Sequence, residues 1–334
     1  MEQPPPQTIL EILFGMWRAR ALHIAARLEL ADHLAAGPRT AAALAAPTGM
    51  DAAALERLLR ALASIGVFRA QDDGAYANTP LSEALRTGVP GTVRDFVLCF
   101  AEDWMLETWK AFPQVIKDGV PAFDPTSGTG LFDFFTEHGP ESASTFDAAM
   151  TNFSALINPM VAQAYDFSSW KRVADVGGGE GSLLADVLGA HPHLHGVLQD
   201  RAEVIARSGR YLSALADRSE TVSGDFFETV PADADGYLLK HVLHDWDDKN
   251  AVRILRTVRE SMPAHARLLI VEFVLTPGSG PDLPVFLDLV MLAYGGRERT
   301  EAEFAGLCER AGLRLERVVP LAPGAPAIVE AVPA

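Results

Sequence analysis

The stretch Val173-Ala-Asp-Val-Gly-Gly-Gly-Glu-Gly-Ser182 runs directly into Leu183-Leu-Ala-Asp-Val-Leu188. This is the order strand, glycine turn, helix, which in a parallel α/β sheet places a ligand at the carboxyl edge of the strands. Three glycines allow the backbone to turn sharply and to approach a ligand without an intervening Cβ: Gly177, Gly179 and Gly181. A nicotinamide fingerprint would have its third glycine at position 182, where this chain has serine. The spacing therefore favours a nucleoside ligand without a pyrophosphate and disfavours a nicotinamide dehydrogenase.

Two further strand ends carry groups suited to a nucleoside. Asp200 ends the next predicted strand, 23 residues after Gly177, where a carboxylate can accept hydrogen bonds from both ribose hydroxyls. The third strand ends at Gly224-Asp225-Phe226, where an acid beside an aromatic ring suits the amino group and ring face of adenine. The three strand ends together predict a nucleoside-binding site.

From Trp170 onwards, short β-branched runs alternate with helical segments, which is typical of a parallel sheet with crossover helices. We predict strands at residues 172–176, 195–199, 221–223, 236–243, 267–275, 314–320 and 327–332. The pattern indicates a doubly wound α/β domain.

The fourth predicted strand leads into Lys240-His-Val-Leu-His-Asp-Trp246. With a strand period of two, Lys240, Val242 and His244 share one face, and His244 stands where the strand reaches the ligand edge. A histidine there can accept a proton near neutral pH if its other ring nitrogen is held by an acceptor. His241 points to the opposite face in this register, and we interpret it as structural.

Two glutamates are candidates for that acceptor. Glu272 interrupts the otherwise apolar run of residues 268–275, where a carboxylate is costly unless it is paired. Glu298 lies in Gly295-Gly-Arg-Glu-Arg-Thr300, after a helical stretch that carries Asp288 and Met291. Taken singly, each acid is also compatible with an ordinary salt bridge.

The N-terminal part is helical and ends in a small hairpin. Apolar residues recur at helical spacing over residues 8–34, Asp51 is a suitable N-cap for a helix over 52–65, and a turn at 72–74 joins two short strands. This order predicts a winged helix. A DNA-recognition helix needs exposed basic residues, whereas residues 52–65 offer only Arg57 and Arg60. Packing against a partner subunit is therefore the favoured role.

Residues 91–165 are helical in pattern and rich in large apolar side chains. Such aromatic stripes usually form the core, and some members can line a pocket for a flat apolar ligand. Phe146 and Met150 are four residues apart and so share one helix face.

Composition restricts the partners and the compartment. The chain of 334 residues has a formal net charge of −16, which disfavours nucleic acid and anionic membranes as partners. Its two cysteines, Cys99 and Cys308, fit a reducing, cytoplasmic compartment, and we find no signal peptide or membrane span in the sequence. We expect no metal, and we interpret the acids at positions 245, 247 and 248 as a solvated helix start.

Four motifs together carry a resemblance to a known family. They are the segments at Asp175 to Gly181, Gly224 to Phe227, His244 to Trp246 and Gly295 to Arg299. The chain resembles, over essentially its whole length, the S-adenosylmethionine (SAM)-dependent O-methyltransferases of the plant caffeate and flavonoid type and the bacterial polyketide-tailoring type. The resemblance implies a Rossmann-like methyltransferase domain at residues 169–334, a winged-helix-like dimerisation region at 1–90 and a helical linker at 91–168.

The resemblance also implies roles for individual residues. Cofactor binding is implied for Gly177, Asp200, Asp225, Phe226 and Lys240, beside Gly179 of the glycine turn. His244 is implied to be the base, flanked by Glu272 and Glu298. The acceptor pocket is implied to include Phe146, Met150 and Met291. Two departures are present: the family's Asp-Leu-Pro is Asp200-Arg-Ala202 here, and the loop before Gly296 is shorter than in the plant enzymes.

The predicted reaction is in-line methyl transfer from SAM to a hydroxyl of a small aromatic molecule, such as a phenol, a quinone or a polyketide-like compound. The sequence leaves an amine acceptor open. A relative of the same fold that catalyses decarboxylation, hydroxylation or a pericyclic step is the main alternative, and a ligand-responsive transcription factor is another. We expect a homodimer, because the apolar faces of the N-terminal helices would otherwise be exposed.

Overall fold

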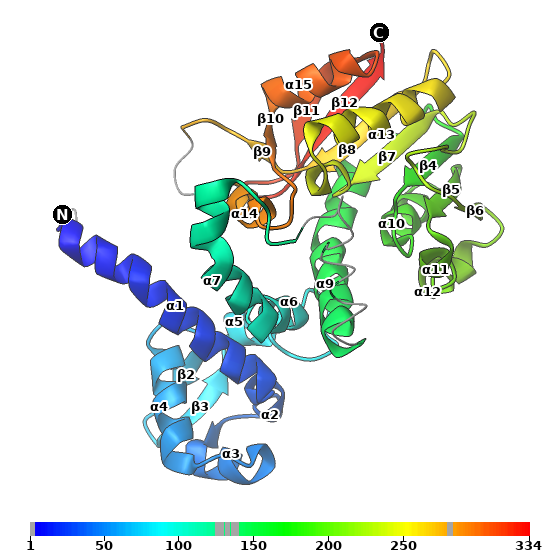
Figure 1. The fold of residues 1–334 in the computed structure, drawn as a ribbon. Helices are drawn as coiled ribbons and strands as arrows, with labels where there is room; N and C mark the ends of the chain where they lie inside the picture. The colour runs from blue at the N-terminus through cyan, green and yellow to red at the C-terminus, as the bar shows by residue number, and fades with distance from the viewer. Residues whose placement is uncertain (1–3, 124–129, 131–133, 135–139, 279–282) are drawn as a thin grey trace. The chain divides into compact units, whose positions relative to one another are not determined.

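The computed structural model describes residues 4–123, 130, 134, 140–278 and 283–334 (Figure 1). The chain divides into two compact units. The first unit is Met1–Lys110 with Phe135–Phe153, and the second is Ala111–Phe134 with Ser154–Ala334. The ranges 1–90, 91–168 and 169–334 expected from the sequence stay predictions.

The first unit contains the predicted winged helix. Helices α3 (Ala41–Thr48) and α4 (Ala52–Ala63) precede the strands β2 (Phe68–Ala70) and β3 (Ala75–Asn78), and β1 (Arg39–Thr40) completes a sheet of order β1-β3-β2. Asp51 caps α4 as predicted, since its carboxylate accepts the Ala54 N–H at 2.8 Å. Short helices α5 (Pro80–Glu83) and α6 (Arg94–Cys99) follow, and α7 (Asp103–Asp118) and α9 (Pro140–Ala164) each span the division between the units.

The N-terminal helical stretch is two helices, α1 (Pro5–Arg27) and α2 (Leu30–His33). They are separated at Glu29, whose φ of 52° is incompatible with a continuing helix. The first half of α1 projects beyond the rest of its unit (Figure 1). Its apolar side chains include five that are more than half exposed: Ile9, Ile12, Leu13, Met16 and Trp17. This exposed face is the kind of surface that a protein partner covers.

The second unit is built on a seven-stranded sheet of order β11-β12-β8-β7-β4-β5-β6. The five strands from β8 to β6 are parallel, and β12 and β11 are antiparallel additions at one edge. The bounds are β4 Arg172–Val176, β5 His195–Asp200, β6 Ser219–Ser223, β7 Gly236–Lys240, β8 Arg267–Glu272, β11 Leu313–Pro320 and β12 Ala327–Pro333. The doubly wound α/β fold is confirmed.

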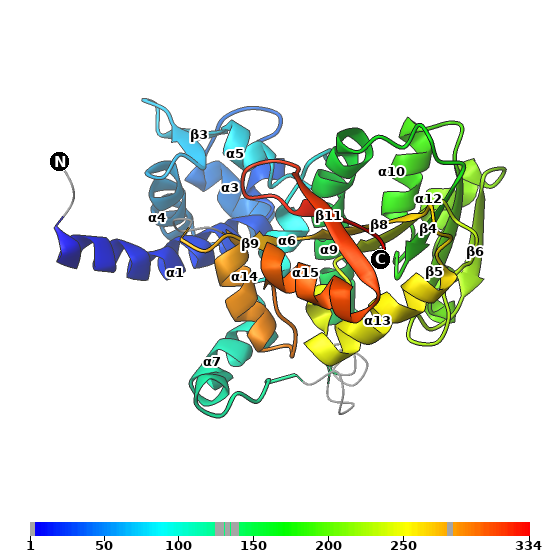
Figure 2. The same cartoon turned by 90° about the horizontal axis from the view of Figure 1, so that it is seen from above.

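Helices cover both faces of this sheet. The chain passes from β4 to β5 through α10 (Ser182–Ala190) and from β7 to β8 through α13 (Asp248–Ser261), and these connections run in opposite directions from the middle of the sheet. Because such crossovers are right-handed, α10 lies on one face, whereas α13 and α15 (Glu301–Arg310) lie on the other (Figure 2). The shorter elements between β5 and β6 are α11 (Ala202–Ile205), α12 (Gly209–Leu212) and η1 (Ser213–Leu215).

The prediction of one strand over residues 236–243 is wrong. β7 ends at Lys240, because His241 has a φ of 52°, and the chain continues into the 3₁₀ turn η2 (Leu243–Asp245). His244 therefore lies on a turn and not on the strand. The run 267–275 is likewise divided into β8 and the short β9 (Val274–Leu275), which pairs in parallel with β10 (Arg299–Thr300). This pairing brings the segment of Glu298 beside the end of β8.

Two further observations concern expectations from composition. No helix within the described ranges is long and apolar enough to cross a membrane. Cys99 and Cys308 are both buried free thiols, and burial raises the pKa of each to about 12.

Candidate active site

The glycine turn after β4 has the geometry that its sequence predicts. Gly177 and Gly179 have φ values of 66° and 64°, a region that residues with a Cβ rarely adopt. A Cβ on Gly177 would lie 3.1 Å from Val242 and 3.3 Å from the ring of Phe226, whereas a Cβ on Gly179 would meet nothing within 4 Å. The turn thus packs closely on one side and leaves open space at Gly179.

Asp200, at the end of β5, is held against this turn. Its Oδ2 accepts the Gly179 N–H at 2.8 Å, and its Oδ1 accepts the N–H of Arg201 at 2.7 Å. Burial raises the pKa of Asp200, and these two backbone donors oppose that effect. The carboxylate is therefore fixed at the carboxyl edge of the sheet, next to the glycine turn.

Phe226 and Asp225 follow β6 at the same edge. Phe226 is half-buried, with its ring close to Gly177 and 6.3 Å from the ring of Trp246 in an edge-to-face arrangement. Asp225 is exposed, and its Oδ1 accepts the N–H of Phe227 at 2.8 Å. The structure therefore brings Gly177, Phe226 and the segment after β7 together, as the order of strand ends predicted.

Lys240 is the last residue of β7, and its side chain is half-buried although it can carry a charge. Its Nζ donates to the Ser154 Oγ at 2.7 Å, from α9. Burial lowers the pKa of Lys240 to about 8, against the opposing charges of Asp175 and Glu272. The amine is thus a half-buried donor that already has one partner within the protein.

Glu272 holds the backbone of the η2 turn. Its Oε1 accepts the N–H groups of Val242 and Leu243, each at 3.0 Å, and that of His244 at 3.4 Å. The left-handed conformation of His241 turns these donors toward one carboxylate oxygen. The other oxygen, Oε2, lies 3.7 Å from Nδ1 of His244 and 3.4 Å from Nδ1 of His241. Glu272 therefore contacts mainly the main chain of the turn.

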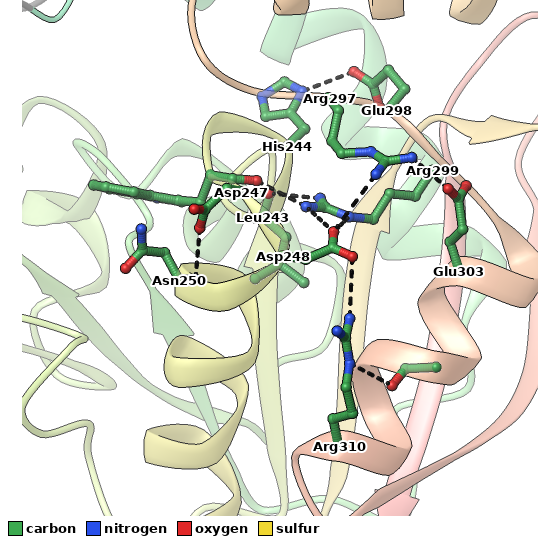
Figure 3. Close-up of polar contacts among 12 residues, drawn as sticks. Leu243, His244, Asp247, Asp248, Asn250, Arg297, Glu298, Arg299, Glu303 and Arg310 are labelled. Carbon is green, nitrogen blue, oxygen red and sulfur yellow. Dashed lines mark hydrogen bonds and ion pairs between the residues drawn. The ribbon is translucent and has the colours of Figure 1, made fainter. Parts of the chain in front are cut away.

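Glu298 contacts the imidazole of His244 directly. Its Oε1 lies 2.9 Å from Nδ1 of His244 (Figure 3), and its own N–H donates to Asp288 at 2.9 Å. An ionised carboxylate can only accept, so we assign the ring proton to Nδ1. This leaves Nε2 of His244 available to accept a proton from a substrate.

The segment 296–299 clamps the η2 turn. A Cβ on Gly296 would lie 2.0 Å from the carbonyl oxygen of His244, so no larger residue fits there. The Arg297 N–H donates to that same oxygen at 2.8 Å. Arg299 donates to the carbonyl oxygens of Leu243 at 2.9 Å and Trp246 at 2.8 Å (Figure 3). His244 and its turn are thus held in place by residues of one loop.

Arg299 is a residue whose role the sequence does not reveal. Its side chain is fully buried and pairs at 3.0 Å with Asp248, which also binds Arg310 at 3.2 Å. The interpretation of the acids at positions 245, 247 and 248 as a solvated helix start is therefore only partly correct. Asp247 caps α13 by accepting the Asn250 N–H, whereas Asp248 lies within ion-pair distance of three arginines, Arg297, Arg299 and Arg310 (Figure 3). The sequence signals available for this pairing are the two arginines of Gly-Gly-Arg-Glu-Arg at 295–299 and the separate group of acids at positions 245, 247 and 248.

Asp245 makes a further contact with His244 that its sequence context does not indicate. Its Oδ1 lies 3.5 Å from Nε2 of His244, the nitrogen that faces away from Glu298. The prediction that His241 points away from His244 is also wrong. Because the strand ends at Lys240, the two imidazole rings lie 5.1 Å apart between centroids.

The carboxylates change the basicity of His244. Burial is the largest influence and lowers the pKa, but Glu272, Asp245 and Glu298 together outweigh it and raise the pKa of His244 to about 10. Burial raises the pKa of Glu272 and Glu298, and the charge of His244 opposes the effect. His244 is thus a half-buried imidazole whose neighbouring carboxylates favour its protonated form.

The predicted acceptor residues fall in both units. Met291 is buried in α14 (Leu283–Leu292), and its Cε would lie 2.8 Å from a Cβ on Gly296. It therefore adjoins the loop that clamps the His244 turn. Phe146 and Met150 lie on α9 within the first unit, both partly buried, and their place in a pocket stays a prediction.

A mixed α/β sheet with a glycine turn, an acid after the second strand and a carboxylate-bound histidine define a nucleoside-dependent transferase. The O-methyltransferase domain matches residues 109–314, and the O-methyltransferase dimerisation domain matches residues 10–88. The chain belongs to this family of O-methyltransferases, and its cofactor is SAM.

Characterised relatives cover nearly the whole chain. A phenazine O-methyltransferase of Lysobacter antibioticus is 40% identical over 99% of this chain and 97% of its own. A mitomycin biosynthesis 6-O-methyltransferase of Streptomyces lavendulae is 41% identical over 97% of this chain and 93% of its own. The S-adenosylhomocysteine (SAH)-bound crystal structure of a methyltransferase of calicheamicin biosynthesis has a TM-score of 0.89 at 39% identity, with 100% of both chains covered.

Proposed function

We propose that this enzyme methylates a hydroxyl group of a small aromatic natural product, with His244 as the base. The observation that carries the proposal is the 2.9 Å contact between Glu298 and Nδ1 of His244, at the sheet edge that also holds the glycine turn. Relatives named for phenazine, mitomycin and dihydroxynaphthoate methylation support an aromatic acceptor. One relative is named as an 8-amino-8-demethylriboflavin N,N-dimethyltransferase, so an amine acceptor is an alternative to a hydroxyl.

The residues at the sheet edge fit the cofactor. We assign its binding to Gly177, Gly179, Asp200, Asp225, Phe226 and Lys240. The open space at Gly179 and the fixed carboxylate of Asp200 beside it suit a ribose, and the ring of Phe226 suits an adenine face. When bound, SAM supplies an electrophilic methyl group on a sulfonium.

His244 removes the proton of the acceptor hydroxyl through Nε2, while Nδ1 stays bonded to Glu298. A phenol near pKa ~10 and an ordinary imidazole near ~6.5 differ by about 5 kcal/mol in the free energy of proton transfer. The surrounding carboxylates raise the pKa of His244 to about 10, so most of this difference disappears. The base therefore matches a phenolic hydroxyl, although only a small fraction of it is unprotonated at neutral pH.

The remaining parts of the proposal concern the assembly and the pocket. We place the acceptor beside Phe146, Met150 and Met291. We propose a homodimer formed through residues 1–90, supported by the match to the dimerisation domain and by the exposed apolar face of α1. The formal charge of −16 supports a protein without nucleic-acid or membrane partners, and the free thiols support a cytoplasmic location.

The test uses His244→Gln with a set of phenolic, quinone and aminophenol acceptors. We expect the wild type to add the mass of one methyl group to an acceptor and to release SAH. His244→Gln should lose at least ~100-fold in rate while its calorimetric affinity for SAH stays the same. The exposed His265, changed to Gln, is the matched control. Turnover of an acceptor without release of SAH would instead favour decarboxylation, hydroxylation or a pericyclic step.

A further inference from the structure

Three side chains around the η2 turn have the composition of a metal site. Within the described part of the chain, His241, His244 and Glu272 each offer a ligand atom, and these atoms all lie within 4.8 Å of one another. Two imidazoles and one carboxylate are a common ligand set for Zn²⁺. The set exists because the left-handed His241 ends β7 and turns its ring toward that of His244.

Two of the three ligand separations are close to those around a tetrahedral ion. Oε2 of Glu272 lies 3.4 Å from Nδ1 of His241 and 3.7 Å from Nδ1 of His244. Zinc bonds of about 2.0–2.1 Å at tetrahedral angles place ligand atoms about 3.3 Å apart. The three ligand atoms, all within 4.8 Å of one another, must approach somewhat to surround one ion.

The charge of the cluster also favours a cation. The side chains of Glu272 and Glu298 are fully buried, and Oε2 of each accepts no hydrogen bond from any residue that the structure describes. Buried carboxylate oxygens of this kind are costly unless a cation or a donor faces them. Oε2 of Glu272 is also the oxygen that points toward both imidazoles.

We propose that His241, His244 and Glu272 bind a divalent transition metal ion, best Zn²⁺, and that the bound ion switches off methyl transfer. This inference rests on the proposed role of His244. The ion takes Nδ1 of the doubly protonated His244 ring in place of the contact with Glu298, and the Nδ1 proton passes to solvent. The single proton of the metal-bound neutral imidazole then stands on Nε2. That nitrogen can no longer accept the proton of an acceptor hydroxyl.

The direct test measures Zn²⁺ binding by the full-length protein against a chromophoric zinc chelator, with no acceptor or cofactor present. We expect one competing ion per wild-type chain. Asn adopts the left-handed conformation readily but is a poor zinc ligand, so His241→Asn should keep the turn and lose the ion. His265→Asn is the matched control, because this exposed histidine lies 3.0 Å from Asp235 and belongs to no cluster of three potential ligands among the residues that the structure describes, so the change should leave binding unchanged.

The second measurement compares the methyl-transfer rate of each variant with Zn²⁺ and with a chelator. Wild type and His265→Asn should lose more than ~10-fold in rate on binding the ion, and His241→Asn should lose almost nothing. SAH affinity and the unfolding temperature show whether His241→Asn is folded, and His241→Gln provides a second variant.

Each outcome has a defined meaning. No zinc binding in the wild type, or equal binding in His241→Asn, overturns the metal site. Binding at His241 without loss of rate overturns the switch. A protein that binds zinc through His241 but methylates no acceptor contradicts the proposed function and leaves the metal site standing.

Discussion

Oε1 of Glu298 lies 2.9 Å from Nδ1 of His244, and this contact is formed by a loop whose other residues bind the main chain of the same turn. The carboxylate fixes the ring orientation and favours its charged form. Glu298→Gln keeps the size of the side chain but removes the charge. We expect kcat to fall about tenfold to a hundredfold with the same SAH affinity, measured by steady-state kinetics and calorimetry. An unchanged kcat would remove Glu298 from the mechanism.

The activity of the wild type should rise with pH through the neutral range. The folded protein raises the pKa of His244 to about 10, so the imidazole is mostly protonated at pH 7, and the unprotonated fraction grows about tenfold for each pH unit below the pKa. In a profile of rate against pH, the midpoint of the rise should therefore lie well above pH 6.5. In Glu298→Gln with the same acceptor, this midpoint should move to lower pH, because one of the carboxylates that raise the pKa of His244 is gone. Coincident profiles would contradict this role of the charge.

Gly296 should tolerate no side chain. A Cβ there would lie 2.0 Å from the carbonyl oxygen of His244. We expect Gly296→Ala to destabilise the fold by about 1–3 kcal/mol and to lower kcat, measured by denaturant unfolding and kinetics. Gly306 in α15 is the control, since a Cβ there meets nothing within 4 Å, and its change to Ala should be neutral or stabilising. Equal effects at both positions would mean that the η2 turn can shift to accommodate a side chain at position 296.

Asp200→Asn tests the cofactor edge. The variant keeps one carbonyl oxygen but loses the charge that orders the Gly179 N–H and is proposed to bind the ribose. We expect the Kd for SAH to rise about tenfold to a hundredfold, which corresponds to about 1.5–3 kcal/mol. Exposed Asp217, changed to Asn, should leave the Kd unchanged. Wild-type affinity in Asp200→Asn would place the ribose elsewhere.

The fold was largely predictable because its signals are local. The alternation of strands and helices, the glycine turn and the cap at Asp51 each depend on a few neighbouring residues. The path of the chain around His244 was not predictable in the same way. A left-handed His241 is selected by three backbone donors that meet Glu272, a residue distant in sequence. Periodicity therefore extended the strand too far and gave His241 the wrong direction.

The candidate site shows the same division. The sequence pointed to Glu272 and Glu298 as acids near the base, but only the structure separates a carboxylate that holds the main chain from one that binds the ring. Arg299 and Asp245 were missed, because charged residues in a loop resemble solvated ones until their burial or contacts are known.

The loop that clamps the base also adjoins Met291, which has a consequence for how new substrates can be accommodated. Backbone shifts between Met291 and Gly296 would be transmitted to the carbonyl oxygen of His244 and to the ring partner Glu298. Redesign of acceptor choice should therefore begin at the proposed pocket positions on α9. Exchange of the loop between homologues should lower turnover before it changes selectivity for the acceptor.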